Sequence, residues 1–155
     1  MANDSGCDGG GTARALRCLR HTAALLWAGP NSVIGLLMVP LGLLPGGSVR
    51  VRDGVIECVV GARPWLARKA AARTGIMVLT LGHVVIAGTE QLLSASRGHE
   101  RVHVRQYERY GPFFLPAYFV SSVIALARGA DPYSQNRFER EAVADAGLIG
   151  PLKRT

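Results

Sequence analysis

Apolar and polar residues alternate most regularly between residues 48 and 60, in the stretch Ser48-Val-Arg-Val-Arg-Asp-Gly-Val-Ile-Glu-Cys-Val-Val60. A period of two is typical of a strand with one buried face, and Asp-Gly is a strong signal for a two-residue hairpin turn. We therefore predict strands near residues 48–52 and 55–60. Residues 75–87 are rich in β-branched residues and predict one or two further strands, with a break at Gly82. Together these segments predict a small antiparallel sheet.

The longest helical pattern covers residues 89–110, and Gly111-Pro112 is expected to end it. We expect Ser94 or Ser96 to cap the start of this helix. Residues 63–74 are helix-like or irregular. Strands combined with long helices predict an α+β fold.

Two further helices are expected towards the C-terminus. Residues 113–127 are apolar and predict a buried helix that starts or bends at Pro116. Asn136 or Gln135 is expected to cap a last helix over residues 137–146, which Gly147 and Pro151 end.

The N-terminal part contains no charged residue between Thr22 and Val49. Its two apolar runs, residues 23–28 and 32–44, are interrupted by Gly29-Pro30-Asn31, and each run alone is too short to cross a bilayer. The alternatives are one kinked transmembrane segment and two short helices packed against the domain. We expect the segment at 22–45 to be the main membrane contact.

The length of 155 residues predicts a single domain over residues 12–150, preceded by a Gly-rich disordered tail at residues 1–11. The net charge of +7 suits an anionic membrane surface, but the arginines are scattered without an aromatic-interleaved basic stripe. This argues against a nucleic acid partner. Cys7, Cys18 and Cys58 lie far apart and predict free thiols.

Residues 99 to 103 have the sequence His99-Glu100-Arg-Val-His103. On a helix, residues four apart lie one turn apart on the same face, so both imidazoles can bind one tetrahedral metal ion. Zinc is the natural ion for such a pair, and it lowers the pKa of a bound water molecule towards neutrality. Glu100 is placed to take a proton from that water. The spacing predicts hydrolytic chemistry, and the alternative is an ordinary histidine pair on an amphipathic helix.

Two histidines leave a catalytic zinc site one protein ligand short. His21 and His83 both lie upstream, and no further histidine follows His103. The remaining candidates are Glu139 and Glu141 on the predicted last helix. For both, the alternative is a solvated face with intrahelical ion pairs.

This arrangement resembles the gluzincin class of zinc metallopeptidases, in which a glutamate on a downstream helix completes the site of an HExxH helix. Glu139-Arg-Glu-Ala142 matches the Glu-x-x-Ala context of that ligand, and Glu141-Ala-Val-Ala-Asp145 matches its Glu-x-x-x-Asp context. The chain also looks like short bacterial HExxH domains. The resemblance covers residues 82–145 and favours Glu139 as the third ligand, with Glu141 as the alternate.

The resemblance implies a zincin-like fold, a bound Zn²⁺ and hydrolysis of a peptide or protein substrate. In zincins the edge strand before the metal helix holds an extended substrate by strand addition, and residues 82–87 lie where that strand is expected. The competing function is a non-catalytic membrane-associated or interaction protein with a structural or vestigial metal site.

Four other residues have both a functional and an ordinary interpretation. Gln106 and Tyr110 follow His103 on the same helical face and either support the site or pack the helix. His83 is expected to be a satisfied strand histidine. Tyr133, in the loop before the last helix, is a candidate for stabilising an oxyanion.

A shared metal ion also restricts the topology. If residues 113–127 crossed a bilayer, His103 and Glu139 would lie about 30 Å apart on opposite sides and could not bind one ion. We therefore expect this segment to fold back. The resulting expectation is a membrane-associated protein with its active site on the cytoplasmic side.

Overall fold

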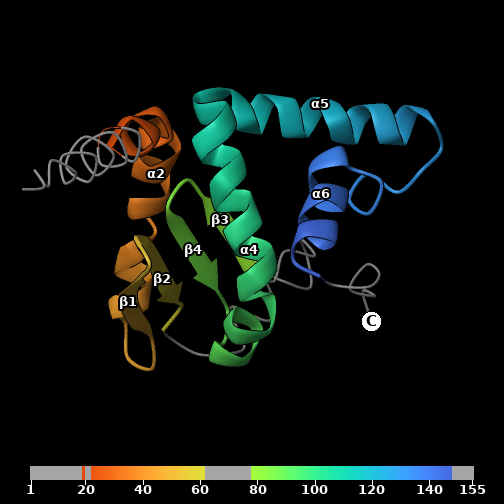
Figure 1. Ribbon diagram of the computed structural model, residues 1–155. Helices are drawn as coiled ribbons and strands as arrows, with labels where there is room; N and C mark the ends of the chain where they lie inside the picture. Colours follow the sequence, from red (N-terminus) through yellow and green to blue (C-terminus); the bar gives the residue numbers. More distant parts are fainter. Residues whose placement is uncertain (1–18, 20–21, 62–77, 148–155) are drawn as a thin grey trace, which may run out of the picture.

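A computed structural model describes residues 19, 22–61 and 78–147 of the chain, and it shows a four-stranded sheet with helices around it (Figure 1). The predicted α+β class is confirmed. The elements are α2 (Gly29–Leu36), η1 (Val39–Leu43), β1 (Ser48–Arg52), β2 (Val55–Val59), β3 (Val78–Leu81), β4 (Val84–Ala87), α4 (Glu90–Tyr110), η2 (Gly111–Phe113), α5 (Phe114–Ala127) and α6 (Arg137–Asp145). The predictions for the tail, for Cys7 and Cys18, and for residues 63–74 lie outside the described residues.

The predicted hairpin is formed by β1 and β2, which pair antiparallel with Arg52 opposite Val55. Its turn residues Asp53 and Gly54 have φ angles of 51° and 76°. Two successive residues with positive φ make the turn type whose twist matches that of the flanking strands, which explains why Asp-Gly occurs here. The predicted break at Gly82 is also present, between β3 and β4.

The sheet is mixed, with the strand order β1-β2-β4-β3, so the prediction of a purely antiparallel sheet was wrong. β4 pairs with β2 in parallel, with Ile56 opposite Val84. β4 therefore lies beside β2, and β3, which comes earlier in the sequence than β4, lies at the edge of the sheet. The expectation that residues 82–87 form the edge strand was therefore also wrong. All four residues of β4 are buried, as suits an interior strand.

Helix α4 begins after Thr89, whose backbone is extended and whose side-chain oxygen accepts the N–H of Leu92. The prediction that Ser94 or Ser96 caps this helix was wrong. Both hydroxyls instead donate to carbonyls of the helix's own preceding turn, as serines inside helices commonly do. At the other end Gly111, with φ of 56°, allows the chain to leave the helix.

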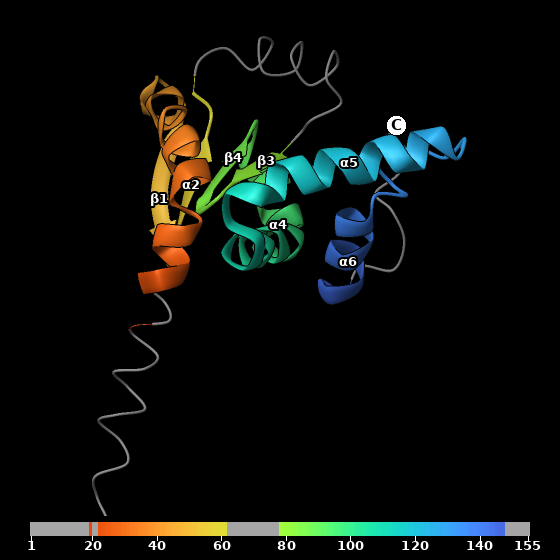
Figure 2. The ribbon, with the colours of Figure 1, turned by 90° about the horizontal axis from the view of Figure 1, so that it is seen from above.

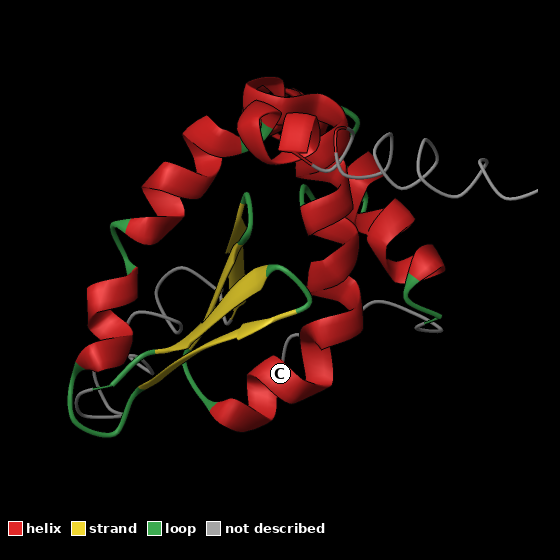
Figure 3. Ribbon diagram, turned by 60° about the vertical axis from the view of Figure 1, so that its left-hand side comes forward, coloured by secondary structure: helices red, strands yellow, loops and turns green. Residues whose placement is uncertain are grey.

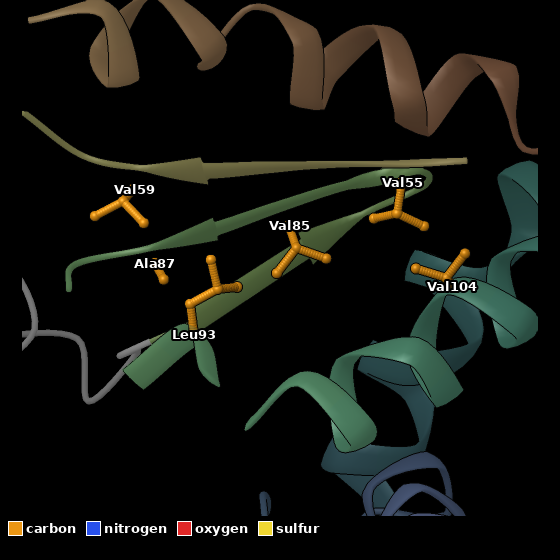
Figure 4. Packing of buried hydrophobic residues seen from close by; sticks show 6 residues of the cluster. All are labelled: Val55, Val59, Val85, Ala87, Leu93 and Val104. Carbon is orange, nitrogen blue, oxygen red and sulfur yellow. The ribbon is translucent and has the colours of Figure 1, made fainter. Parts of the chain in front are cut away.

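Helices cover both faces of the sheet (Figure 3). On one face α4 packs against valines of the strands, and its Leu93 is fully buried in this cluster (Figure 4). On the other face η1 covers Cys58, which is a buried free thiol, and α2 covers β4. Gly35 of α2 lies so close that an added Cβ would be 2.7 Å from Cβ of Val84. The sheet therefore fixes the position of α4.

The N-terminal apolar segment consists of helical residues 22–27 followed by α2 and η1, with a break at Ala28. This corresponds to short helices packed against the domain. Most of their large apolar side chains are nevertheless exposed on the other side.

After η2, α5 turns across the end of α4, and the following loop brings α6 back beside α4 (Figures 1 and 2). The expected return of the chain is therefore present. The expectation of a buried helix was wrong, because only two residues of α5, Phe114 and Ala125, are buried. α6 begins as predicted after Asn136, whose side-chain oxygen accepts the N–H of Phe138.

By length and composition, residues 90–127 could cross a membrane. The same test is passed by core helices of soluble proteins, and here the stretch is interrupted by η2 and divided into two helices of different direction (Figure 1). The side of a membrane that the candidate site faces stays a prediction.

Candidate metal centre

Helices α4 and α6 bring His99, His103 and Glu139 together. Nε2 of His99 lies 3.0 Å from Nε2 of His103 and 3.1 Å from Oε2 of Glu139. Nε2 of His103 lies 3.4 Å from Oε1 of Glu139. All three residues are buried, with exposed fractions of 5%, 7% and 4%. They form a buried group that can hold a metal ion.

The geometry of this group fits a tetrahedral zinc ion. Zinc binds imidazole nitrogens and carboxylate oxygens at about 2.0–2.2 Å, so two ligand atoms of one ion lie roughly 3.3 Å apart. The distances of 3.0, 3.1 and 3.4 Å among the two imidazole nitrogens and the two carboxylate oxygens bracket this value. Each of the three residues can therefore offer one ligand atom to a single ion.

Gln106 determines which nitrogen of His103 carries the proton. Its Nε2 group donates to the carbonyl of Phe138 and to Oε2 of Glu141, both at 3.1 Å. Its Oε1 atom must then be the one that lies 2.9 Å from Nδ1 of His103, and an amide oxygen can only accept. Nδ1 of His103 therefore donates, and in the neutral imidazole Nε2 presents its lone pair to the common point. Supporting a ligand histidine in this way is usual in metal sites.

Glu139 is held in place from α5. The hydroxyl of Tyr118 donates to Oε1 of Glu139 at 2.7 Å, and Nδ2 of Asn136 donates to the carbonyl of Tyr118 at 3.0 Å. Glu141 instead accepts the amide of Gln106 and lies 3.9 Å from Nη1 of Arg109. Of the two candidate glutamates, the structure thus places Glu139 against the histidines.

The charges of the cluster depend on one another. Burial alone would raise the pKa of Glu139, but the facing imidazoles of His103 and His99 outweigh it and hold this pKa far below its ordinary value. Burial would lower the pKa of His103, but the carboxylate of Glu139 outweighs it and raises this pKa. The carboxylate therefore stays ionised and requires a cation, which is either a proton on the imidazoles or a metal ion.

Two buried polar atoms of the cluster, Nδ1 of His99 and Oε2 of Glu139, have no hydrogen-bond partner among the described residues. Buried polar atoms in native proteins are nearly always paired, and an atom left without a partner often marks the place of a bound ion or water molecule. The unpaired oxygen of Glu139 is the one that faces His99.

Glu100 lies beside this group and is also buried. Oε2 of Glu100 accepts the hydroxyl of Thr80 on the edge strand β3 at 2.6 Å, and the carbonyl of Thr80 accepts the hydroxyl of Tyr107 at 3.0 Å. Burial raises the pKa of Glu100 and outweighs the opposing effect of His103. A carboxyl group with a raised pKa is suited to exchanging protons near neutral pH.

The other predicted residues have varied positions. Tyr110 packs edge-on against Phe138 with ring centroids 5.4 Å apart, so its role is packing. His83 is satisfied as expected, but in the turn between β3 and β4, where Nε2 lies 3.1 Å from Oε1 of Glu108. Tyr133 lies in the loop before α6 with 37% of its surface exposed, and its role at an oxyanion stays a prediction.

Two residues of the site were not singled out from the sequence. Tyr118 belongs to the Pro116-Ala-Tyr118 stretch of the predicted buried helix, where an isolated tyrosine hydroxyl needing a partner was the available signal. Thr80 had no comparable signal, because its partner Glu100 lies on a different element.

Comparisons with protein families, with curated proteins and with solved structures find no match for this chain.

Proposed function

We propose that this chain is a zinc-dependent metallopeptidase in which His99, His103 and Glu139 bind the ion. The observation that carries the proposal is the convergence of three buried ligand atoms, one of them on an imidazole whose tautomer is set by Gln106. Zinc with three protein ligands supplies a Lewis acid that polarises a carbonyl group and acidifies a coordinated water molecule.

In this proposal Glu100 acts as the general base. It directly follows the first ligand, it is buried, and burial raises its pKa, which favours proton uptake from water. The hydroxyl of Thr80 orients the carboxyl group by holding Oε2. The proton taken from water is then passed to the amine that leaves when the peptide bond breaks.

The peptide class of substrate is supported by the resemblance to gluzincins and by the position of β3. This strand lies at the edge of the sheet, and its Thr80 contacts Glu100. A peptide that extends the sheet along β3 would therefore pass close to the general base. We therefore propose that β3, rather than residues 82–87, holds an extended substrate by strand addition.

The test compares the wild type with Glu100→Gln on an unbiased peptide library, with the zinc content of both proteins measured in parallel. We expect cleavage to fall by about 10²–10⁴-fold while zinc is retained, because the substitution removes a proton acceptor and not a ligand. The His83→Gln variant is the matched control, since His83 lies outside the cluster, and it should keep its activity.

A second candidate function is a structural metal site in a protein without turnover. It is favoured by the burial of all four site residues and by the hydrogen bond that already engages Glu100. If wild type and Glu100→Gln both contain zinc and cleave the library equally poorly, this second function replaces the first.

A further inference from the structure

Helix α5 turns its polar side chains towards the protein. The hydroxyl of Tyr118 donates to Glu139, Oγ of Ser121 accepts the backbone N–H of Arg137 at 2.9 Å, and Oγ of Ser122 accepts Nδ2 of Asn136 at 2.7 Å. These three residues and the buried Phe114 and Ala125 occupy one side of the helix.

The opposite half of α5 is entirely apolar and entirely exposed. With 3.6 residues per turn, its members span about half of the helix circumference. They are Leu115, Pro116, Phe119, Val120, Val123, Ile124, Leu126 and Ala127, and no polar residue of α5 is exposed. A helix that faces water has the reverse distribution, with its polar residues outside.

The N-terminal segment has the same inverted pattern. Every exposed residue from 23 to 45 is apolar, with Leu26 75%, Val33 57% and Leu37 73% exposed. Its polar residues point inwards instead. Nδ2 of Asn31 donates to the carbonyl of Gly111 at 2.9 Å, and Oγ of Ser32 accepts the N–H of His83 at 3.1 Å.

The two apolar surfaces meet. The rings of Trp27 and Phe113 lie 6.1 Å apart and are 47% and 64% exposed. Gly111 is also packed directly against the indole of Trp27. α5 and the first part of the N-terminal segment lie at the end of the molecule where α4 ends, whereas η1 lies further down, beside β1 (Figure 1). We call the exposed residues of 23–45 and 113–127 together the apolar face.

We infer that the apolar face inserts into the interfacial layer of an anionic membrane, so that α5 lies in the membrane plane. Trp27 and Phe113 at its centre are residues that favour this layer. No charged residue occurs in 22–49 or in 110–127, and arginines lie beside α5 at its end (Arg128) and at the neighbouring ends of α4 and α6 (Arg109, Arg137). Basic residues beside an apolar surface are complementary to anionic headgroups.

Two other arrangements fit the apolar face less well. Coiled-coil pairing with a second copy of the chain would use a narrow apolar stripe on each helix, whereas here half of α5 and a second segment are apolar. A transmembrane α5 would be about 21 Å long against a hydrocarbon core of about 30 Å, and the hydrogen bonds on its inner side fix it to the protein.

The test is flotation of the full chain with vesicles of phosphatidylcholine and phosphatidylglycerol, and with vesicles of phosphatidylcholine alone. We expect binding to the anionic vesicles and a drop in partitioning of about tenfold or more for Phe119→Glu. Val51→Glu is the matched control, because Val51 on β1 is 71% exposed outside the apolar face. Arg128→Gln should weaken binding a few fold, for anionic vesicles alone.

A second measurement does not depend on the variant's solubility. In a Trp65→Phe background, where Trp27 is the remaining tryptophan, its fluorescence should shift to shorter wavelength when anionic vesicles are added. The inference is overturned if the wild type does not float at low salt, or if Val51→Glu weakens binding as much as Phe119→Glu. It is also overturned if the wild type is a dimer that does not bind vesicles and the Phe119→Glu substitution makes this dimer dissociate.

Discussion

Two buried carboxylates, Glu57 on β2 and Glu139 on α6, face helix α4 from different sides, and their partners differ in kind. Glu57 is 1% exposed and Glu139 is 4% exposed, so each needs positive charge nearby. Glu57 is surrounded by guanidinium groups and Glu139 by imidazoles.

The cluster around Glu57 is complete within the protein. Nε of Arg50 and Nε of Arg97 each lie 2.8 Å from its oxygens, and a guanidinium group is always charged. Burial alone would raise the pKa of Glu57, but hydrogen bonds from Arg97 and Arg50 outweigh it and lower this pKa. Such a cluster joins the β1–β2 hairpin to α4 and has no need of an ion.

The cluster around Glu139 has no permanent cation. Its imidazoles can be neutral, Gln106 directs the lone pair of His103 inwards, and Oε2 of Glu139 has no hydrogen-bond partner among the described residues. The positive charge beside Glu139 can therefore be either a proton on an imidazole or a metal ion. The comparison therefore separates a carboxylate that stabilises the fold from one suited to binding a metal.

The largest effect is expected for Glu139→Gln. A neutral amide is a poor zinc ligand, so zinc affinity should fall by about a thousandfold or more, measured by competition with a chromogenic chelator. Glu57→Gln should bind zinc like the wild type when folded. If wild type and Glu139→Gln bound zinc with equal affinity, Glu139 would not be a metal ligand and would not differ in function from Glu57.

Removing Glu57 should mainly affect stability. Glu57→Ala removes the buried partner of Arg97 and one of two partners of Arg50, which also pairs with Glu90, and we expect the free energy of unfolding to fall by about 1.5–3 kcal/mol. Urea unfolding followed by circular dichroism measures it. A change below about 1 kcal/mol would show that this cluster does not hold the hairpin to α4.

A smaller effect is expected for Gln106→Leu, which keeps the volume of the side chain but loses the acceptor for Nδ1 of His103. Zinc affinity should fall by about 10–100-fold, as for other residues that orient a ligand histidine. Tyr110→Phe is the control on the same helix, since Tyr110 packs against Phe138. Equal losses in both variants would point to helix packing as the cause.

The smallest effect is a change in acid stability. The pKa of Glu57 is lowered in the folded state, so its stabilisation is present above the ordinary glutamate pKa of about 4.3 and is lost as the pH falls through its folded pKa. Glu57→Gln should therefore lose less stability than the wild type between pH 6 and pH 3 in urea unfolding. Parallel pH profiles of the two proteins would contradict this assignment.

Local signals in the sequence predicted much of the fold. Asp53-Gly54 specified the hairpin, and the end of α4 at Gly111 and the start of α6 after Asn136 also followed from single residues. The spacing of His99 and His103 placed both on one face of α4. These features depend on neighbours within a few residues, which is why the sequence alone reveals them.

Features that depend on distant partners could not be predicted. The alternation in residues 48–60 and the β-branched residues of 75–87 indicate strands but do not determine which strands are neighbours, so the parallel pairing of β2 with β4 was missed. The contact of Thr80 with Glu100 follows from that arrangement. The exposure of α5 was missed because a core helix and a lipid-facing helix have the same apolar composition.

The central claim is that His99, His103 and Glu139 bind one zinc ion, and the most direct test is the metal content of the purified full chain by mass spectrometry. We predict close to one zinc per chain for the wild type and almost none for His103→Ala, with the fold of both verified by circular dichroism. A wild type without zinc after growth in zinc-supplemented medium, or a His103→Ala variant that retains its zinc, would contradict the account.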